Sequence, residues 1–279
     1  MAIVGLGLIG GSVALDLKNK IPGVQIIGVD MNERHCQMAL ALKIVNEVKT
    51  IEQAVIDAEL VILAIPVDAL IKVLPIVLGL LEPGCTLMDM GSTKSLICDQ
   101  VKYHPKRGQF VASHPMAGTE NSGPGAAKEA LFAGHTAVIC EAQKSHPAHL
   151  AHVENLYDIL KMRLVYMEAK EHDVHIAYIS HLSHICSFVL ANTILAKETD
   201  ISTIFNLAGG GFESTVRLAK SSPEMWCPIF AQNKENILFA VESFREHLNM
   251  FYDALQSEDC SLSFELIRTA NGIRKVWSQ

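Results

Sequence analysis

The sequence predicts an α/β protein, with a doubly wound and mainly parallel sheet in its N-terminal part and only helices in its C-terminal part. Short apolar runs alternate with helix-periodic segments up to residue 168, which is typical of a parallel sheet covered by helices on both faces. Beyond that point the segments are long and helix-periodic, and the strand pattern stops. We therefore expect two domains, residues 1–168 and residues 169–279.

The expected strands are short runs rich in Val, Ile and Leu. They are residues 2–5, 24–30, 60–67, 85–91, 109–115, 136–142 and 164–169. The expected helices are residues 8–19, 33–43, 51–58, 68–81, 94–103, 149–163, 172–196 and 233–256. Residues 58–81 form one long apolar stretch, but Asp68 and Lys72 interrupt it, so a buried strand followed by a helix is expected there and not a membrane span.

The composition and the net charge indicate which kinds of binding partner and which cellular compartment to expect. Hydrophobic residues make up 49% and charged residues 19%, and the formal net charge is −7. A negative balance argues against nucleic acid as a partner. The seven cysteines include no CxxC pair, and the N-terminus lacks the basic and apolar regions of a signal peptide. We therefore expect a protein of the reducing cytoplasm without structural disulfides.

The segment AIVGLGLIGGS contains a glycine pattern typical of a Rossmann dinucleotide-binding turn. Gly5, Gly7 and Gly10 have GxGxxG spacing between the first expected strand and the first expected helix. The first glycine permits a tight turn, the second lets the backbone approach a pyrophosphate, and the third lets the helix pack on the strand. The free N–H groups at the helix N-terminus would bind the phosphates.

An acidic residue, Asp30, ends the second expected strand, twenty positions after Gly10. A carboxylate there accepts hydrogen bonds from ribose hydroxyls and repels a 2′-phosphate, which favours NAD over NADP. The residues expected to contact the dinucleotide are Gly5, Leu6, Gly7, Leu8, Ile9, Gly10, Asp30, Ile65 and Pro66.

Two candidate catalytic residues follow later strands, at the sheet edge where α/β proteins bind ligands. Ser92 lies in DMGSTKS and His114 lies in VASHPMAG. A neutral imidazole has a pKa suited to removing a hydroxyl proton, and Ser92 could hydrogen-bond the same oxygen. Pro115 restricts the backbone of His114.

Four histidines lie in the segment EHDVHIAYISHLSHICSF. In a continuous helix, His172 and His175 would face away from His181 and His184, because nine residues correspond to about two and a half turns. The segment therefore predicts no metal site, and either an interior position or contact with a substrate is expected for the second pair.

A triple glycine precedes a short helix that carries Arg217 and a segment that contains Trp226. The backbone at Gly211 can come close to a ligand, and the guanidinium can bind a carboxylate through two hydrogen bonds. The alternative is a loop with a solvated arginine.

The motifs GLGLIGGS, SHPMAGTENSG, SHLSH and AGGGFESTVRLAKSSPEMW occur in this order, and with them the chain resembles the prephenate dehydrogenase family, which includes arogenate and cyclohexadienyl dehydrogenases. The resemblance implies a Rossmann domain joined to a helical dimerisation domain, a homodimer, and an enzyme of tyrosine biosynthesis. It implies oxidation of the ring alcohol of prephenate with loss of the ring carboxylate as carbon dioxide, which yields 4-hydroxyphenylpyruvate.

The resemblance also implies roles for single residues. His114 corresponds to the catalytic histidine and Ser92 to the serine that bonds the same oxygen. Arg217 corresponds to an arginine that binds a substrate carboxylate. Glu120 corresponds to an acid near the entrance, which we expect to pair with Arg217. The other residues expected to contact the substrate are His184, Trp226 and Gly211.

Alternatives remain open from the sequence. Glu213, close to Arg217, would suit the ammonium group of arogenate. A 3-hydroxyacid dehydrogenase or imine reductase would need a lysine in the helical part, where Lys220 is the candidate. A dinucleotide-sensing module without activity is the third alternative.

Overall fold

The computed structural model describes residues 1–56, 58–197, 203, 206–257 and 259–276. The chain divides into two compact units, Met1–Asn233 and Lys234–Gln279. The first unit contains the sheet and every residue that the sequence singled out for binding or catalysis.

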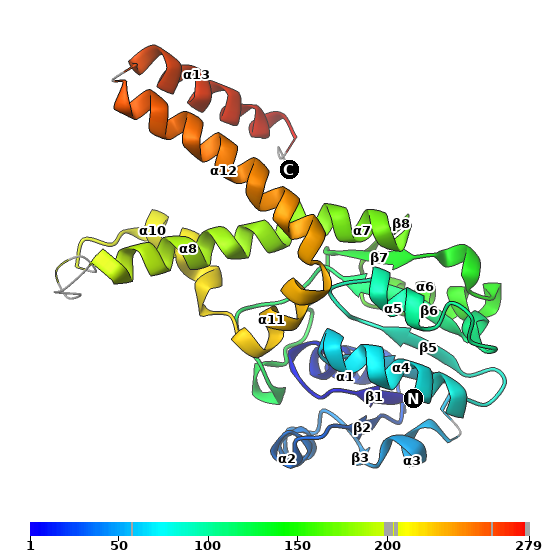
Figure 1. Ribbon diagram of the computed structural model, residues 1–279. Coiled ribbons are helices and arrows are strands. Elements are labelled where there is room, and N and C mark those ends of the chain that lie inside the picture. The colour runs from blue at the N-terminus through cyan, green and yellow to red at the C-terminus, as the bar shows by residue number, and fades with distance from the viewer. Residues whose placement is uncertain (57, 198–202, 204–205, 258, 277–279) are drawn as a thin grey trace. The chain divides into compact units, whose positions relative to one another are not determined.

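The first unit is built on an eight-stranded sheet with the strand order β3-β2-β1-β4-β5-β6-β7-β8 (Figure 1). The strands are β1 Ala2–Val4, β2 Ile27–Val29, β3 Glu47–Val48, β4 Leu60–Leu63, β5 Thr86–Asp89, β6 Phe110–Pro115, β7 Thr136–Cys140 and β8 Arg163–Met167. All neighbours are parallel except β6 and β7, which are antiparallel. The predicted mainly parallel sheet is confirmed. The sequence missed β3, since two residues are too few to show a strand pattern.

Both faces of this sheet are buried. Along β1, Ala2 and Val4 belong to one hydrophobic core and Ile3 to the other, because successive side chains of a strand point to opposite faces. The first core includes residues of α4 and α5, and the second includes residues of α1 and α6. The helices around the sheet are α1 Leu8–Lys20, α2 Glu33–Ala41, α3 Ile51–Val55, α4 Val67–Leu80, α5 Ser95–Gln100 and α6 Pro147–Ile159, with the short turns η1 Arg107–Gln109, η2 Pro124–Ala126 and η3 Ala142–Lys144. The doubly wound arrangement is therefore confirmed.

Among the residues that the structure describes, only helical elements follow β8. In the first unit they are α7 Ala169–Ile176, the π-helical turn η4 Ala177–His181, α8 Leu182–Lys197, α10 Gly210–Val216, η5 Arg217–Lys220 and α11 Pro223–Gln232. The second unit contains α12 Lys234–Gln256, α13 Cys260–Ala270 and η6 Asn271–Lys275. Here α12 and α13 pack side by side as an antiparallel pair (Figure 1).

The predicted domain boundary at residues 168 and 169 coincides with the end of the sheet, whereas the two compact units divide after Asn233. Helices α7 to α11 therefore pack with the sheet as part of the first unit, and the boundary at 168 stays a prediction.

One continuous helical stretch, Ala169–Lys197, is long and apolar enough to cross a membrane by length and composition, and 22% of its most apolar window is buried within the chain. One such helix is weak support for a membrane protein, since core and interface helices of soluble proteins have the same composition. Its exposed apolar side chains include Ile179, Val189 and Leu195.

Candidate active site

The predicted glycine turn joins β1 to α1, and the lack of a side chain has a different structural role at each of its three glycines. Gly5 has φ +96°, and a Cβ atom there would lie 2.3 Å from the carbonyl oxygen of Ala64. A Cβ atom on Gly10 would lie 2.0 Å from the carbonyl oxygen of Gly5. A Cβ atom on Gly7, in contrast, would meet nothing within 4 Å. Two glycines are therefore required by packing, and the third keeps a space open beside the start of α1.

The N-terminus of α1 faces this space without a side-chain cap, because Gly7 is its N-cap residue. Its first N–H groups are thus available to an anion such as a pyrophosphate. The open space at Gly7 and these N–H groups together fit a dinucleotide.

Asp30 lies beside the same turn, at the end of β2. Its carboxylate accepts hydrogen bonds from the backbone N–H groups of Leu6 and Asn32, each at 2.8 Å, and lies 3.4 Å from Nδ1 of His35. These bonds fix the carboxylate next to the glycine turn, where the predicted ribose contact would be made. The side chain of Leu6 is fully buried, so only its backbone faces the turn.

The remaining predicted cofactor residues lie around the same edge. Leu8 and Ile9 form the first turn of α1, and Ile65 and Pro66 follow β4, the neighbour of β1 in the sheet. The Cγ2 atom of Ile65 lies 2.8 Å from the position of a Cβ atom on Gly5. The structure therefore brings all nine predicted residues to one region, and their contacts with a cofactor stay predictions.

His114 lies at the end of β6 and is 9% exposed. Its Nδ1 atom lies 2.9 Å from Nε2 of His172, and Nδ1 of His172 lies 2.8 Å from Oδ1 of Asp173. The Asp173 carboxylate also accepts the backbone N–H groups of Lys94 and Ser95, each at 2.8 Å. A continuous hydrogen-bonded chain therefore runs from the start of α5 through α7 to the strand-end histidine.

The imidazole of His114 is neutral at pH 7. Burial lowers the pKa of His114 well below its ordinary value, and the nearby His172, Lys94 and His181 lower it further. Burial also lowers the pKa of His172, although its hydrogen bond to Asp173 acts in the opposite direction. A neutral imidazole retains a lone pair, which proton abstraction requires.

A buried ion pair supports the strand that carries His114. Lys94 is fully buried, and its ammonium group contacts the Asp89 carboxylate and donates to the carbonyl oxygen of Ser113 at 2.7 Å. Asp89 also accepts the N–H groups of Gly91 and Ser113, at 2.9 Å and 3.1 Å. These contacts tie the loop after β5 to β6.

Ser92 is half-buried in this same loop, between two anchored neighbours. Gly91 is held by Asp89, and Thr93 Oγ1 donates to Gln232 Oε1 at 2.6 Å. Because β5 and β6 are adjacent parallel strands, Ser92 and His114 lie at the same edge of the sheet. The Ser92 hydroxyl has no hydrogen-bond partner among the residues that the structure describes.

The helix predicted over residues 172–196 is not a regular α-helix throughout, because residues 177–181 form a π-helical turn, and this corrects the expectation for its histidines. The π-helical turn at 177–181 inserts one extra residue, so His172 and His181 are separated by about 80° instead of about 180° around the axis. Asn233 Nδ2 accordingly donates to the carbonyl oxygen of Asp173 at 2.7 Å and lies 3.2 Å from Nδ1 of His181. Within the described part of the chain, no group of three or more His, Cys, Asp and Glu side chains is arranged to hold a metal ion.

His184 and Trp226 stack on each other, with ring centroids 3.7 Å apart, and His181 contacts the edge of the same indole. Nδ1 of His184 donates to the carbonyl oxygen of Ser180 at 3.0 Å. Burial lowers the pKa of His181 to about 4, so this ring is neutral. The structure thus joins the two predicted residues in one aromatic cluster.

Arg217 and Glu120 form the expected ion pair, with Nη1 of Arg217 2.9 Å from Oε2 of Glu120. The Arg217 side chain is 53% exposed, so its guanidinium can also contact a ligand. Gly211 lies in the first turn of α10, the helix that leads to Arg217, with open space beside its Cα atom.

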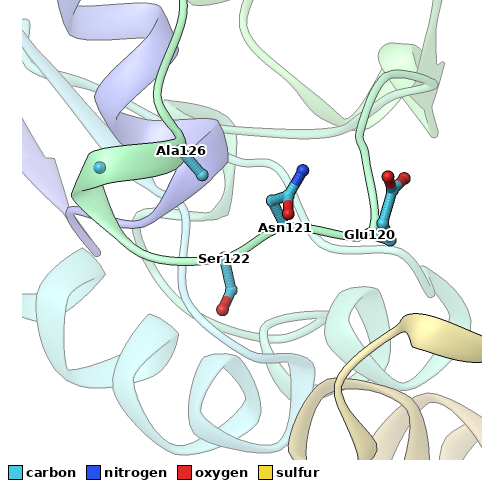
Figure 2. Close-up of a pocket in the computed structure, with 5 residues that line it drawn as sticks. Glu120, Asn121, Ser122 and Ala126 are labelled. Carbon is cyan, nitrogen blue, oxygen red and sulfur yellow. The ribbon is translucent and has the colours of Figure 1, made fainter.

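Glu120 also lines a hollow of about 550 Å³ together with Asn121, Ser122, Gly125 and Ala126. Figure 2 shows Glu120 and Asn121 projecting to one side of the loop and Ser122 to the other. The loop is anchored to α1 by a hydrogen bond of 3.0 Å from the N–H group of Lys128 to Ser12 Oγ. The hollow therefore lies beside the helix that begins at the glycine turn.

The sequence reasoning missed the contributions of His172, Asp173 and Lys94 to the site. In the sequence, His172 is a candidate only for metal binding, and no motif marks Asp173 or Lys94. The nearest signal was the position of Lys94, two residues after Ser92. The roles of the predicted residues in catalysis and substrate binding stay predictions.

Comparison with known proteins assigns both parts of the chain. The family model described as "Prephenate dehydrogenase, nucleotide-binding domain" matches residues 13–166. The model described as "Prephenate dehydrogenase, dimerization domain" matches residues 168–269. These two matches cover most of the chain.

Individual relatives agree with this assignment. The chain is 33% identical to the prephenate dehydrogenase of Bacillus subtilis over 275 residues, which cover 98% of this chain and 74% of that protein. The crystal structure of prephenate dehydrogenase from A. aeolicus, in complex with hydroxyphenyl propionate and NAD+, is 30% identical and superposes with a TM-score of 0.87, covering 99% of this chain and 97% of that one. Synechocystis arogenate dehydrogenase is 27% identical with a TM-score of 0.78 and 99% coverage of both chains.

These matches favour a dehydrogenase of this family over the 3-hydroxyacid dehydrogenase alternative and over a sensing module. The chain belongs to the prephenate dehydrogenase family of oxidoreductases.

Proposed function

We propose that this chain catalyses the NAD-dependent oxidative decarboxylation of prephenate to 4-hydroxyphenylpyruvate, a step in tyrosine biosynthesis. The observation that carries the proposal is the buried, neutral imidazole of His114 at the sheet edge that also holds the glycine turn. It supports the proposal because oxidation of an alcohol requires a group that takes the hydroxyl proton. The similarity to the Bacillus subtilis prephenate dehydrogenase supports the choice of substrate.

The residues of the site have separate tasks in this proposal. His114 accepts the proton of the ring hydroxyl, and Ser92 donates a hydrogen bond to the same oxygen. Arg217 binds a substrate carboxylate with its guanidinium. Bound NAD supplies the hydride acceptor. Loss of the ring carboxylate makes the ring aromatic, and this supplies the driving force for decarboxylation.

The preference for NAD over NADP rests on Asp30. The hydrogen bonds from Leu6 and Asn32 hold its carboxylate beside the glycine turn. A fixed negative charge there favours the ribose hydroxyls of NAD and repels the 2′-phosphate of NADP.

Steady-state kinetics with prephenate and arogenate, each with NAD and with NADP, test the proposal. We expect the highest kcat/KM for prephenate with NAD. A higher value for arogenate would favour the alternative in which Glu213, four residues before Arg217, pairs with the ammonium group of that substrate. Absence of turnover with either substrate would contradict the proposed function.

A homodimer in the cytoplasm completes the proposal. The second unit exposes Phe239, Leu248 and Leu255 on α12 and Phe264 on α13, more apolar surface than a monomer usually leaves uncovered. The match to a dimerization domain supports a second copy as the cover. All seven cysteines are free, as in proteins of a reducing compartment.

Light scattering coupled to gel filtration tests the dimer. We expect twice the chain mass of 30.5 kDa. Phe239→Glu, at a position that is 72% exposed, should shift the mass towards the monomer, whereas Glu242→Gln on the same helix should not. A monomeric wild-type protein would contradict the proposal.

A further inference from the structure

We infer that His172 and Asp173 are positioning residues that fix the tautomer of His114, with the proton on Nδ1 and the lone pair on Nε2. The inference deepens the proposed function, on which its catalytic consequence rests. It uses two buried titratable groups that the proposed reaction steps do not otherwise require.

The carboxylate of Asp173 has only acceptor atoms when it is ionised. Its Oδ1 atom receives the N–H group of Lys94 and its Oδ2 atom receives that of Ser95. Burial raises the pKa of this carboxyl, but hydrogen bonds from His172 and Ser95 outweigh burial and hold the pKa below its ordinary value. Asp173 is therefore ionised at neutral pH, and Nδ1 of His172, 2.8 Å away, carries a proton and donates it to Oδ1.

The state of His172 then determines that of His114. A neutral imidazole with its proton on Nδ1 has an acceptor lone pair on Nε2. Because Nε2 of His172 lies 2.9 Å from Nδ1 of His114, the His114 atom must be the donor. Nδ1 of His114 thus carries the proton, and Nε2 of His114 is the free base.

This arrangement also provides for the charge that the reaction creates. When Nε2 of His114 takes the hydroxyl proton, the proton on its Nδ1 can move to Nε2 of His172. The positive charge then lies next to the Asp173 carboxylate, which is 2.8 Å from the His172 ring. The opposite tautomer of His114 would present an N–H group to the alcohol and could not act as a base.

Asp173 also connects the two predicted catalytic residues. The N–H groups that it accepts belong to Lys94 and Ser95, which directly follow the loop of Ser92. One carboxylate on α7 therefore sets the position of the Ser92 loop and, through His172, the ring of His114.

Nitrogen-15 NMR of the histidine-labelled wild-type protein at pH 7.5, without substrate, tests the tautomer. The His114 signals are assigned by their loss in His114→Asn. We expect a protonated Nδ1 and an unprotonated Nε2, and a proton on Nε2 would overturn the inference. The result does not depend on prephenate turnover, so it separates failure of this inference from failure of the proposed function.

Kinetics of two substitutions test the consequence. His172→Leu removes the acceptor, and we expect kcat to fall by about 10²-fold or more, since groups that orient a catalytic histidine contribute between about 10-fold and 10⁴-fold. KM for prephenate should change by less than about threefold, because His172 is buried and its ring nitrogens bond His114 and Asp173. The side-chain oxygen of His172→Gln can accept from Nδ1 of His114 and should recover about tenfold or more of the lost kcat.

His175→Leu, which removes an exposed imidazole from the same helix, should retain the wild-type kcat. Wild-type kcat in His172→Leu, or equal losses in His172→Leu and His172→Gln, would overturn the inference. If His172→Leu does not fold, as judged by circular dichroism, the tautomer measured in the wild-type protein decides.

Discussion

Some side chains of the site are buried and held in one position, whereas others are exposed and can change partners. His114, His172 and Lys94 are buried and hydrogen-bonded, so each is held in one position. Arg217 and Glu120 are more exposed, and an exposed ion pair costs little to separate. Arg217 can therefore exchange the Glu120 carboxylate for a carboxylate of the substrate, while the buried groups keep the geometry of the base.

Arg217→Ala should raise KM for prephenate by roughly 10- to 100-fold, the value of a hydrogen-bonded charge pair. We expect kcat to change by less than about fivefold, because Arg217 binds the substrate before and during the reaction equally. Glu120→Gln is the matched comparison, and it should leave KM unchanged or lower it, since it removes the competing carboxylate. An unchanged KM in Arg217→Ala would refute the predicted role of this residue.

The sequence predicted those residues of the site that lie in recognisable motifs, but not the groups that support them. The sequence motifs predict His114, Ser92 and Arg217, and they also predict the ion pair between Arg217 and Glu120. His172 lies 58 positions from His114, and Asp173 lies 79 positions from Lys94. Hydrogen bonds across such separations depend on how the helices cross the sheet, which residue types alone do not specify.

Among the elements, the turn between β1 and α1 combines two constraints in one motif, namely close packing of the backbone and space for a ligand. Gly5 and Gly10 have no room for a side chain, whereas Gly7 has open space beside it. Packing and ligand binding can therefore be separated by substitution.

Gly7→Ala should leave the melting temperature unchanged and raise KM for NAD by about tenfold or more, because its methyl group enters the space that fits the pyrophosphate. Gly10→Ala should lower the melting temperature or prevent folding, because its methyl group would overlap the carbonyl oxygen of Gly5. Thermal unfolding and cofactor titration of both variants provide the measurements. An unchanged KM for NAD in Gly7→Ala would argue against a dinucleotide at this turn.

Most elements were predictable because apolar periodicity reports burial directly. The exceptions include β3, which is two residues long, helix α11 around Trp226, and the π-helical turn at 177–181. The sequence of that turn, AYISH, contains no glycine or proline that would mark a break. The turn was therefore unpredictable from local preference, although it brings His181 close to Asp173 through Asn233.

At the scale of the whole molecule, three buried histidines link folding to pH. Burial lowers the pKa of His114, His172 and His181, in the last case to about 4. The unfolded chain binds protons at these positions near pH 6.5, whereas the folded chain does not, so the unfolded state gains protons first on acidification. Stability is therefore complete above about pH 6.5 and decreases as the pH falls towards the folded pKa values.

The free energy of unfolding should accordingly fall by about 1–4 kcal/mol between pH 7 and pH 5.5. Urea unfolding at both pH values measures this difference. Carboxylates contribute little in this window, because Asp173, for example, has a pKa below its ordinary value. Equal or greater stability at pH 5.5 would contradict the neutral, buried state of these histidines.

In the proposed reaction His114 takes the proton of the substrate alcohol, and the turnover of His114→Asn measures this role. At saturating prephenate and NAD, we expect kcat to fall by roughly 10²- to 10⁴-fold, the contribution of a positioned acid or base. KM for NAD should be unaffected, because the glycine turn remains intact. A rate close to that of the wild-type enzyme would contradict the account.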